Sequence, residues 1–111
     1  MVDTGVWPET RSFSDHGLPP PPNKWKGSCV TTTDFPASSC NHKLVGAKFF
    51  SKGYVAINGP INQTVDSNSP RDARGHGSHT ASTAAGSPVA NASLLGYAQR
   101  TARGIAPTAR L

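Results

Sequence analysis

Two short motifs bring together residue types that could carry proton-transfer chemistry. In the first, Asp3-Thr4-Gly5 follows the apolar Val2 at the expected end of a strand. In the second, residues 74–80 read Arg-Gly-His-Gly-Ser-His-Thr, and His76 stands at the expected start of a helix. In a Ser-His-Asp relay the carboxylate holds one imidazole nitrogen, and the other nitrogen takes the nucleophile's proton. The two motifs could therefore supply the carboxylate and the general base of such a relay.

The elements that must position these residues are short. Residues 77–86 carry only small side chains, apart from His79, and Gly86-Ser87-Pro88 is a stop signal, which predicts a helix that packs closely against a sheet or another helix. The apolar, β-rich run at 43–50 predicts a short strand. Residues 104–111 predict a turn that enters a strand, and residues 8–28 predict a long loop with a stretch of four prolines.

Composition limits the chain to one small, loop-rich domain. It has 111 residues, of which Gly 11 and Pro 10 together make 21, and 35% are hydrophobic. Large apolar residues are few, so we expect a weak core and doubtful stability for the chain on its own. No run of 18 apolar residues is present, and no transmembrane helix or membrane partner is expected.

The net charge of +5 comes mainly from arginines toward the C-terminal end. A nucleic-acid interface would need clustered basic residues with interleaved aromatic side chains, and only Tyr97 lies near these arginines. We therefore expect no nucleic-acid partner and interpret the charge as a solvated face.

Cysteine usage and glycosylation signals favour a secreted protein. Cys29 and Cys40 lie eleven positions apart, a spacing that is not typical of a zinc site or a redox pair. In a secreted chain these two cysteines would pair with each other. The sequons at Asn62 and Asn91 predict glycosylation of an exposed surface.

A metal site is the alternative interpretation of the histidine-rich motif. His76 and His79 are separated by three positions and Asp72 is near, but a zinc site usually needs a further His, Cys or carboxylate ligand. We therefore expect no metal and no cofactor.

The motifs, taken in order along nearly the whole chain, resemble those of plant-type subtilases, which are subtilisin-like serine endopeptidases. Asp-Thr-Gly alone is weak, whereas its combination with Gly-His-Gly-Ser-His-Thr-Ala-Ser-Thr-Ala-Ala-Gly is very specific. The matching stretches are residues 3–9, 12–15, 25–27 with Cys29, Cys40-Asn41 with 43–50, 69–72, 75–86 and 102–107.

The resemblance implies that Asp3 is the relay carboxylate, that His76 is the general base and that His79 is structural. It implies a disulfide between Cys29 and Cys40. It also implies an α/β fold, a parallel sheet with helices on both faces, and an extracellular location in the apoplast or cell wall. The expected substrates are proteins or peptides.

The departures from the family pattern are as informative. No Gly-Thr-Ser-Met-Ala nucleophile motif occurs in residues 1–111, and the oxyanion-hole asparagine with its surrounding segment is missing too. Arg74 stands where the family usually has Asp, and Arg100 stands where Gly is usual, which would be costly if that position needs a positive φ.

Residues 1–111 are therefore expected to be an incomplete N-terminal portion of the catalytic domain, cut within strands at both ends. The resemblance implies that the chain belongs to a serine endopeptidase, but without the serine this portion is expected to be inactive alone. The alternative is a truncated, catalytically dead product that acts, if at all, by binding another protein.

Overall fold

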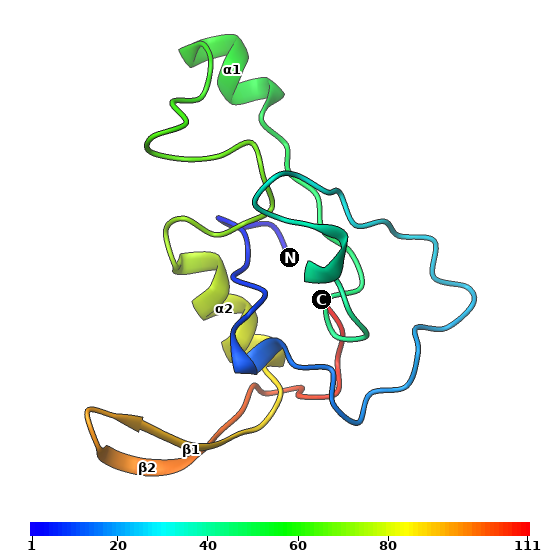
Figure 1. The fold of residues 1–111 in the computed structure, drawn as a ribbon, viewed down its shortest axis with the longest axis vertical. Helices are drawn as coiled ribbons and strands as arrows, with labels where there is room; N and C mark the ends of the chain where they lie inside the picture. Colours follow the sequence, from blue (N-terminus) through cyan, green and yellow to red (C-terminus); the bar gives the residue numbers. More distant parts are fainter.

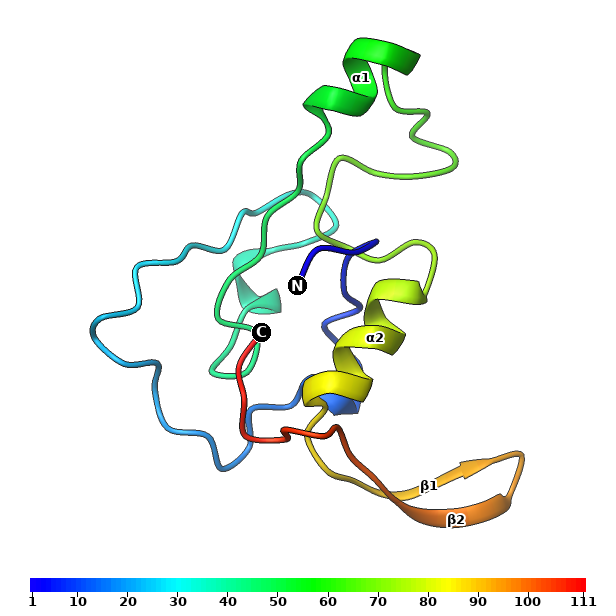
Figure 2. The same ribbon diagram turned by 180° about the vertical axis from the view of Figure 1, so that it is seen from behind.

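The computed structural model describes all residues from Met1 to Leu111. Along the chain come two 3-10 turns, Arg11–Phe13 and Ala37–Ser39, then helices α1 (Lys52–Asn58) and α2 (His76–Ala85), and strands β1 (Val89–Leu94) and β2 (Tyr97–Ala102). Helix α1 and the β1–β2 hairpin extend from opposite ends of the molecule, and both chain termini lie in the loop-rich region between them (Figures 1 and 2). The radius of gyration is 15.2 Å, against about 13 Å for a compact domain of this length, so the molecule is open.

Helix α2 confirms the helix predicted over 77–86. Its buried face consists of Gly77, Ala81 and Ala85, a spacing of four that places these small residues on one stripe. It ends at Gly86, whose N–H donates to Ser82 O at 2.8 Å. A stripe without bulky side chains lets the backbone of α2 lie close to the N-terminal segment.

The core is small, as the composition indicates. Phe13, Leu44 and Ala81 form a buried cluster, and Val6 and Leu111 pack against it. This cluster joins the first 3-10 turn, the segment around residue 44 and the middle of α2. It therefore fixes α2 against the segment that carries Asp3.

The expected parallel sheet with flanking helices is not present in residues 1–111. The one regular sheet is the antiparallel pair β1–β2, in which Val89 faces Ala102 and Leu94 faces Tyr97. Parallel pairing is limited to two isolated bridges, Val6 with Arg71 and Cys29 with Ala47. Each of these segments contributes a single bridge, so no continuous parallel strand forms.

Four local expectations also need correction. Residues 43–50 form no strand beyond the bridge at Ala47, and the turn within residues 104–111 leads into no strand. Helix α1 was not expected, and it buries no residue. Arg100 does not have a positive φ, so the strain considered for this position does not arise; the left-handed non-glycine residues are Asn91, Leu95 and Ala98.

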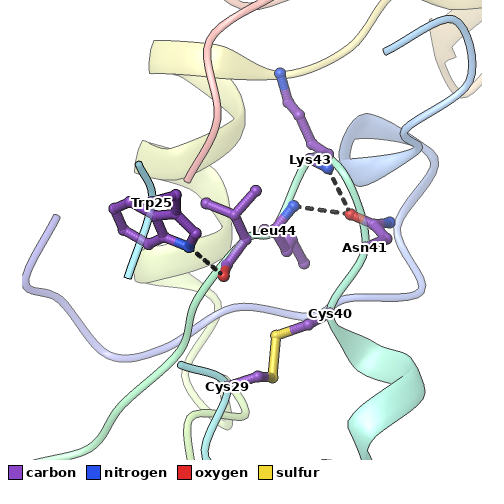
Figure 3. Close-up of a disulfide and its surroundings, with 7 residues drawn as sticks. Trp25, Cys29, Cys40, Asn41, Lys43 and Leu44 are labelled. Atoms are coloured by element: carbon purple, nitrogen blue, oxygen red, sulfur yellow. Dashed lines mark hydrogen bonds between the residues drawn. A yellow bond between two sulfur atoms is a disulfide. The ribbon is translucent and has the colours of Figure 1, made fainter. Parts of the chain in front are cut away.

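Cys29 and Cys40 form the expected disulfide, which closes a surface loop with a sequence separation of 11 (Figure 3). Next to it, Asn41 Oδ1 accepts hydrogen bonds from the N–H groups of Lys43 at 2.8 Å and Leu44 at 2.7 Å. The Trp25 indole N–H donates to Val45 O at 3.2 Å. The crosslink and these bonds hold the residue 25–29 segment beside the core.

Reduction of this disulfide is expected to lower the free energy of unfolding by about 2–3 kcal/mol, because the open chain regains the entropy of a short loop. The measurement is urea unfolding with and without reductant, together with non-reducing peptide mapping for a Cys29–Cys40 peptide. A double Cys29→Ser, Cys40→Ser variant is the control, since reductant should not change its midpoint. Free thiols in secreted material would contradict the expectation.

Candidate active site

The structure brings Asp3 and His76 into contact although 73 positions separate them. His76 Nδ1 lies 2.7 Å from Asp3 Oδ1. The Asp3 side chain is 17% exposed, whereas the His76 side chain is 69% exposed. Since Nδ1 is held by the carboxylate, an Nδ1–H tautomer leaves Nε2 as a solvent-facing proton acceptor, and no residue of the chain hydrogen bonds to it. This geometry can orient a general base toward an incoming group.

Two glycines allow the segment that carries Asp3 to approach α2. Gly5 has φ +117°, and a Cβ there would meet Pro70 O at 2.5 Å. A Cβ at Gly77 would collide with the backbone of Gly5. The bridge between Val6 and Arg71 then fixes the register, through Val6 N–H to Pro70 O at 3.0 Å and Asp72 N–H to Val6 O at 3.1 Å.

The carboxylate of Asp3 is held in its ionised form. The hydrogen bond with His76, followed by that from the Thr4 N–H at 2.7 Å, lowers the pKa of Asp3 below its usual 3.8. The Thr80 hydroxyl lies 2.9 Å from Asp3 Oδ2 and is a third donor. Both carboxylate oxygens are therefore occupied, and one of them faces the imidazole.

Asp72 organises the start of α2. It is 2% exposed. Its Oδ1 accepts from the N–H groups of Arg74 at 2.9 Å and Gly75 at 2.7 Å, and its Oδ2 accepts from Ser78 N–H at 2.8 Å and Ser78 Oγ at 2.7 Å. Burial raises the pKa of Asp72, but the hydrogen bonds from Ser78 and from the loop N–H groups outweigh burial and hold this pKa well below 3.8. Asp72 thus satisfies N–H groups that the first turn of a helix leaves without partners.

This arrangement predicts acid sensitivity. Because the pKa of Asp72 is lowered in the folded state, its stabilising contribution is fully present above its usual pKa of 3.8 and is lost gradually as pH falls from there toward the lowered folded-state pKa. Urea unfolding of the wild type and of Asp72→Asn at pH 7, 5 and 3 tests this expectation. The wild type should be more stable at pH 7 and 5, and the difference between the two proteins should shrink toward pH 3. A difference that does not change with pH would contradict it.

Arg71 fixes the loop that follows Asp3. Its guanidinium forms two hydrogen bonds to the Glu9 carboxylate at 2.9 and 2.6 Å and lies 4.9 Å from the centre of the Trp7 ring. Its Nε donates to Asp34 O. The hydrogen bond from Arg71 lowers the pKa of Glu9. The segment of residues 3–9 is therefore anchored beyond the site.

The other predicted site residues lie apart from this pair. Asn62 and Asn91 are both exposed, so glycosylation at these positions stays a prediction. His79 is exposed, and its side chain makes no hydrogen bond.

No group of three or more His, Cys, Asp or Glu side chains is placed to hold a metal ion. Neither α-helix has the length and apolarity needed to cross a bilayer.

Sequence reasoning considered Asp72 only as a possible metal ligand and missed the roles of the hydroxyl and carboxylate groups around the pair, namely Thr4, Asp72, Ser78 and Thr80. A signal existed for Asp72, because an acidic residue shortly before a helix is typical of a group that caps the helix N-terminus. The partners of Thr4 could not be found this way, since they lie 68 and 73 positions away.

An exposed imidazole oriented by a carboxylate has the geometry that the general-base half of a hydrolase relay requires. The sequence matches the subtilase family, peptidase S8, over residues 1–111, and the chain belongs to this family of subtilisin-like serine proteases.

Several plant proteins are similar to the chain. It is 60% identical over 111 residues to subtilisin-like protease SBT1.7 of Arabidopsis thaliana, and 57% identical over 114 residues to subtilisin-like serine-protease S of Lotus japonicus. It is 50% identical over 111 residues to subtilisin-like protease SBT3 of Solanum lycopersicum. These alignments cover 100% of this chain but 15%, 15% and 14% of the respective relatives. The chain thus spans about one seventh of the length of these relatives.

Proposed function

We propose that the chain supplies the carboxylate and the general base of a serine endopeptidase that hydrolyses peptide bonds in proteins or peptides. The observation that carries the proposal is the 2.7 Å contact between Asp3 Oδ1 and His76 Nδ1 in a member of the subtilase family. In the proposed step, His76 Nε2 takes the proton of a serine hydroxyl as that oxygen attacks the substrate carbonyl. The imidazolium that forms is stabilised by Asp3 and then gives its proton to the leaving amine.

We infer that the nucleophilic serine lies outside residues 1–111. No serine of this chain hydrogen bonds to His76, and the hydroxyl of the nearby Ser78 is engaged with Asp72. Residues 1–111 on their own are therefore proposed to be inactive toward peptides, and to act together with the remainder of a catalytic domain.

Secretion is proposed on two observations. The chain carries a disulfide between Cys29 and Cys40, and disulfides persist in oxidising compartments. The sequon residues Asn62 and Asn91 are exposed, as glycosylation would require. The proposed location is extracellular, in the apoplast or cell wall.

The experiment that tests the function is fluorophosphonate labelling of the endogenous protein, followed by intact mass measurement. A labelled species much heavier than 11.6 kDa would support a serine endopeptidase that includes this chain. A heat-denatured sample is the control, because labelling requires an assembled relay. An unlabelled species of about 11.6 kDa, after allowance for sugars, would contradict the proposal and favour a product that acts by binding.

A further inference from the structure

We propose that Asp72 is a positioning residue that sets the geometry between the Asp3 carboxylate and the His76 imidazole, acting through the hydroxyls of Thr4 and Ser78. The inference rests on the proposed function for its effect on turnover. Asp72 itself does not touch Asp3 or the His76 ring, so its influence must pass through the groups that it binds.

The first connection runs through Thr4. The N–H of Gly77 donates to Thr4 Oγ1 at 2.8 Å, and Thr4 Oγ1 donates to Asp72 Oδ1 at 2.9 Å. Thr4 directly follows Asp3, and Gly77 directly follows His76. This hydroxyl therefore joins the chain neighbours of both members of the pair.

The second connection runs through Ser78 in the same manner. The N–H of Trp7 donates to Ser78 Oγ at 2.9 Å, and Ser78 Oγ donates to Asp72 Oδ2 at 2.7 Å. One oxygen of Asp72 thus serves each hydroxyl. The segment 3–7 and the first turn of α2 are tied together at two points on either side of one buried carboxylate.

The position of Asp72 suits a group that only accepts hydrogen bonds, because three backbone N–H groups donate to it as well as the two hydroxyls. The hydroxyls of Thr4 and Ser78 each accept from a backbone N–H and donate their one proton to Asp72. An ionised carboxylate accepts all five hydrogen bonds at this position. An asparagine would present two donors at one end, which would face either the Ser78 N–H and hydroxyl or the N–H groups of Arg74 and Gly75. An amide nitrogen cannot accept from those N–H groups, so at least one backbone hydrogen bond that fixes the first turn of α2 or the loop before it is then lost.

A substitution at Asp72 or Thr4 is expected to change the geometry between Asp3 and His76, not the contacts with the substrate. Small displacements of a relay member by a change outside the reacting atoms can cost about 10²-fold in rate. We expect Asp72→Asn to lower kcat by about 10²-fold and Thr4→Val by about tenfold, with KM little changed. Thr4→Ser keeps the hydroxyl and should stay near wild type.

The test uses the full-length protein and two readouts. Steady-state kinetics on a fluorogenic peptide gives kcat and KM separately. The second readout is the ¹H NMR signal of the His76 Nδ1–H, assigned by its loss in His76→Ala, and it reports the hydrogen bond to Asp3 without any turnover. Asp34→Asn is the matched control, because the Asp34 carboxylate also accepts a hydroxyl hydrogen bond, from Thr32 at 2.7 Å, but makes no hydrogen bond to Thr4, Ser78, Asp3 or His76.

A lower kcat together with a weakened or shifted Nδ1–H signal in Thr4→Val, restored in Thr4→Ser, supports the proposal. An unchanged kcat and signal in both Asp72→Asn and Thr4→Val overturns it, as does a rise in KM alone. If Asp72→Asn does not fold, Thr4→Val decides, since Thr4 is exposed and its replacement leaves the core intact. If the wild type has no His76-dependent turnover but its Nδ1–H signal is lost in Thr4→Val, the proposed function fails while the positioning role stands.

Discussion

His76→Ala is expected to lower kcat by about 10⁶-fold, the scale set by removal of the same group in subtilisin. The reason is the position of the imidazole, which is oriented at Nδ1 by Asp3 and leaves Nε2 open to solvent. Without it the serine has no proton acceptor, and about 8 kcal/mol of transition-state stabilisation is lost. The measurement is kcat of the full-length protein on a peptide substrate, with KM determined in parallel.

The matched control for this prediction is His16→Ala. His16 is an exposed histidine in the loop after the first 3-10 turn, and its side chain makes no hydrogen bond. The same substitution there should leave kcat near wild type. Turnover retained in His76→Ala would exclude His76 as the general base.

Asp3→Asn is expected to lower kcat by about 10⁴-fold, as in other relays in which this carboxylate becomes an amide. Two orientations of the amide are open, and each weakens the relay. With its nitrogen toward His76 Nδ1, the imidazole must carry its proton on Nε2 and cannot accept the serine proton. With its oxygen there, the tautomer is kept, but no charge stabilises the imidazolium.

The same rate measurement checks this second prediction, with Asp66→Asn as the control. Asp66 is a surface carboxylate 3.9 Å from Arg74, and its replacement removes one charge without touching the pair. A near-normal kcat in Asp3→Asn would show that Asp3 is not the relay carboxylate.

The hydrogen bond from His76 lowers the pKa of Asp3, so Asp3 stays ionised as pH falls through 5. Protonation of Asp3 is therefore not expected to limit kcat at that pH.

The sequence predicted those features of the site that depend on neighbouring residues, and it missed those that depend on residues far apart along the chain. The motifs around residues 3 and 76 identified the pair, and Gly86 marked the end of α2, because these signals are local. The α/β class was confirmed, but the parallel sheet was not confirmed in residues 1–111, since the parallel contacts of Val6 and Cys29 are single bridges. The residues of strands β1 and β2 are mostly exposed. Their sequence therefore has no alternation of apolar and polar side chains from which the two strands could have been predicted.

The contacts that hold the pair join residues 68 to 73 positions apart, and this separation has a consequence for how the molecule folds. Contacts between distant residues form only after the entropy of closing the intervening loop has been overcome, which makes them slow. Helix α2 can form early from local contacts, but its imidazole has no carboxylate beside it until the N-terminal segment docks. The oriented imidazole is therefore expected only after this segment has docked, so the long separation along the chain would delay the assembly of the pair relative to the helix that carries half of it.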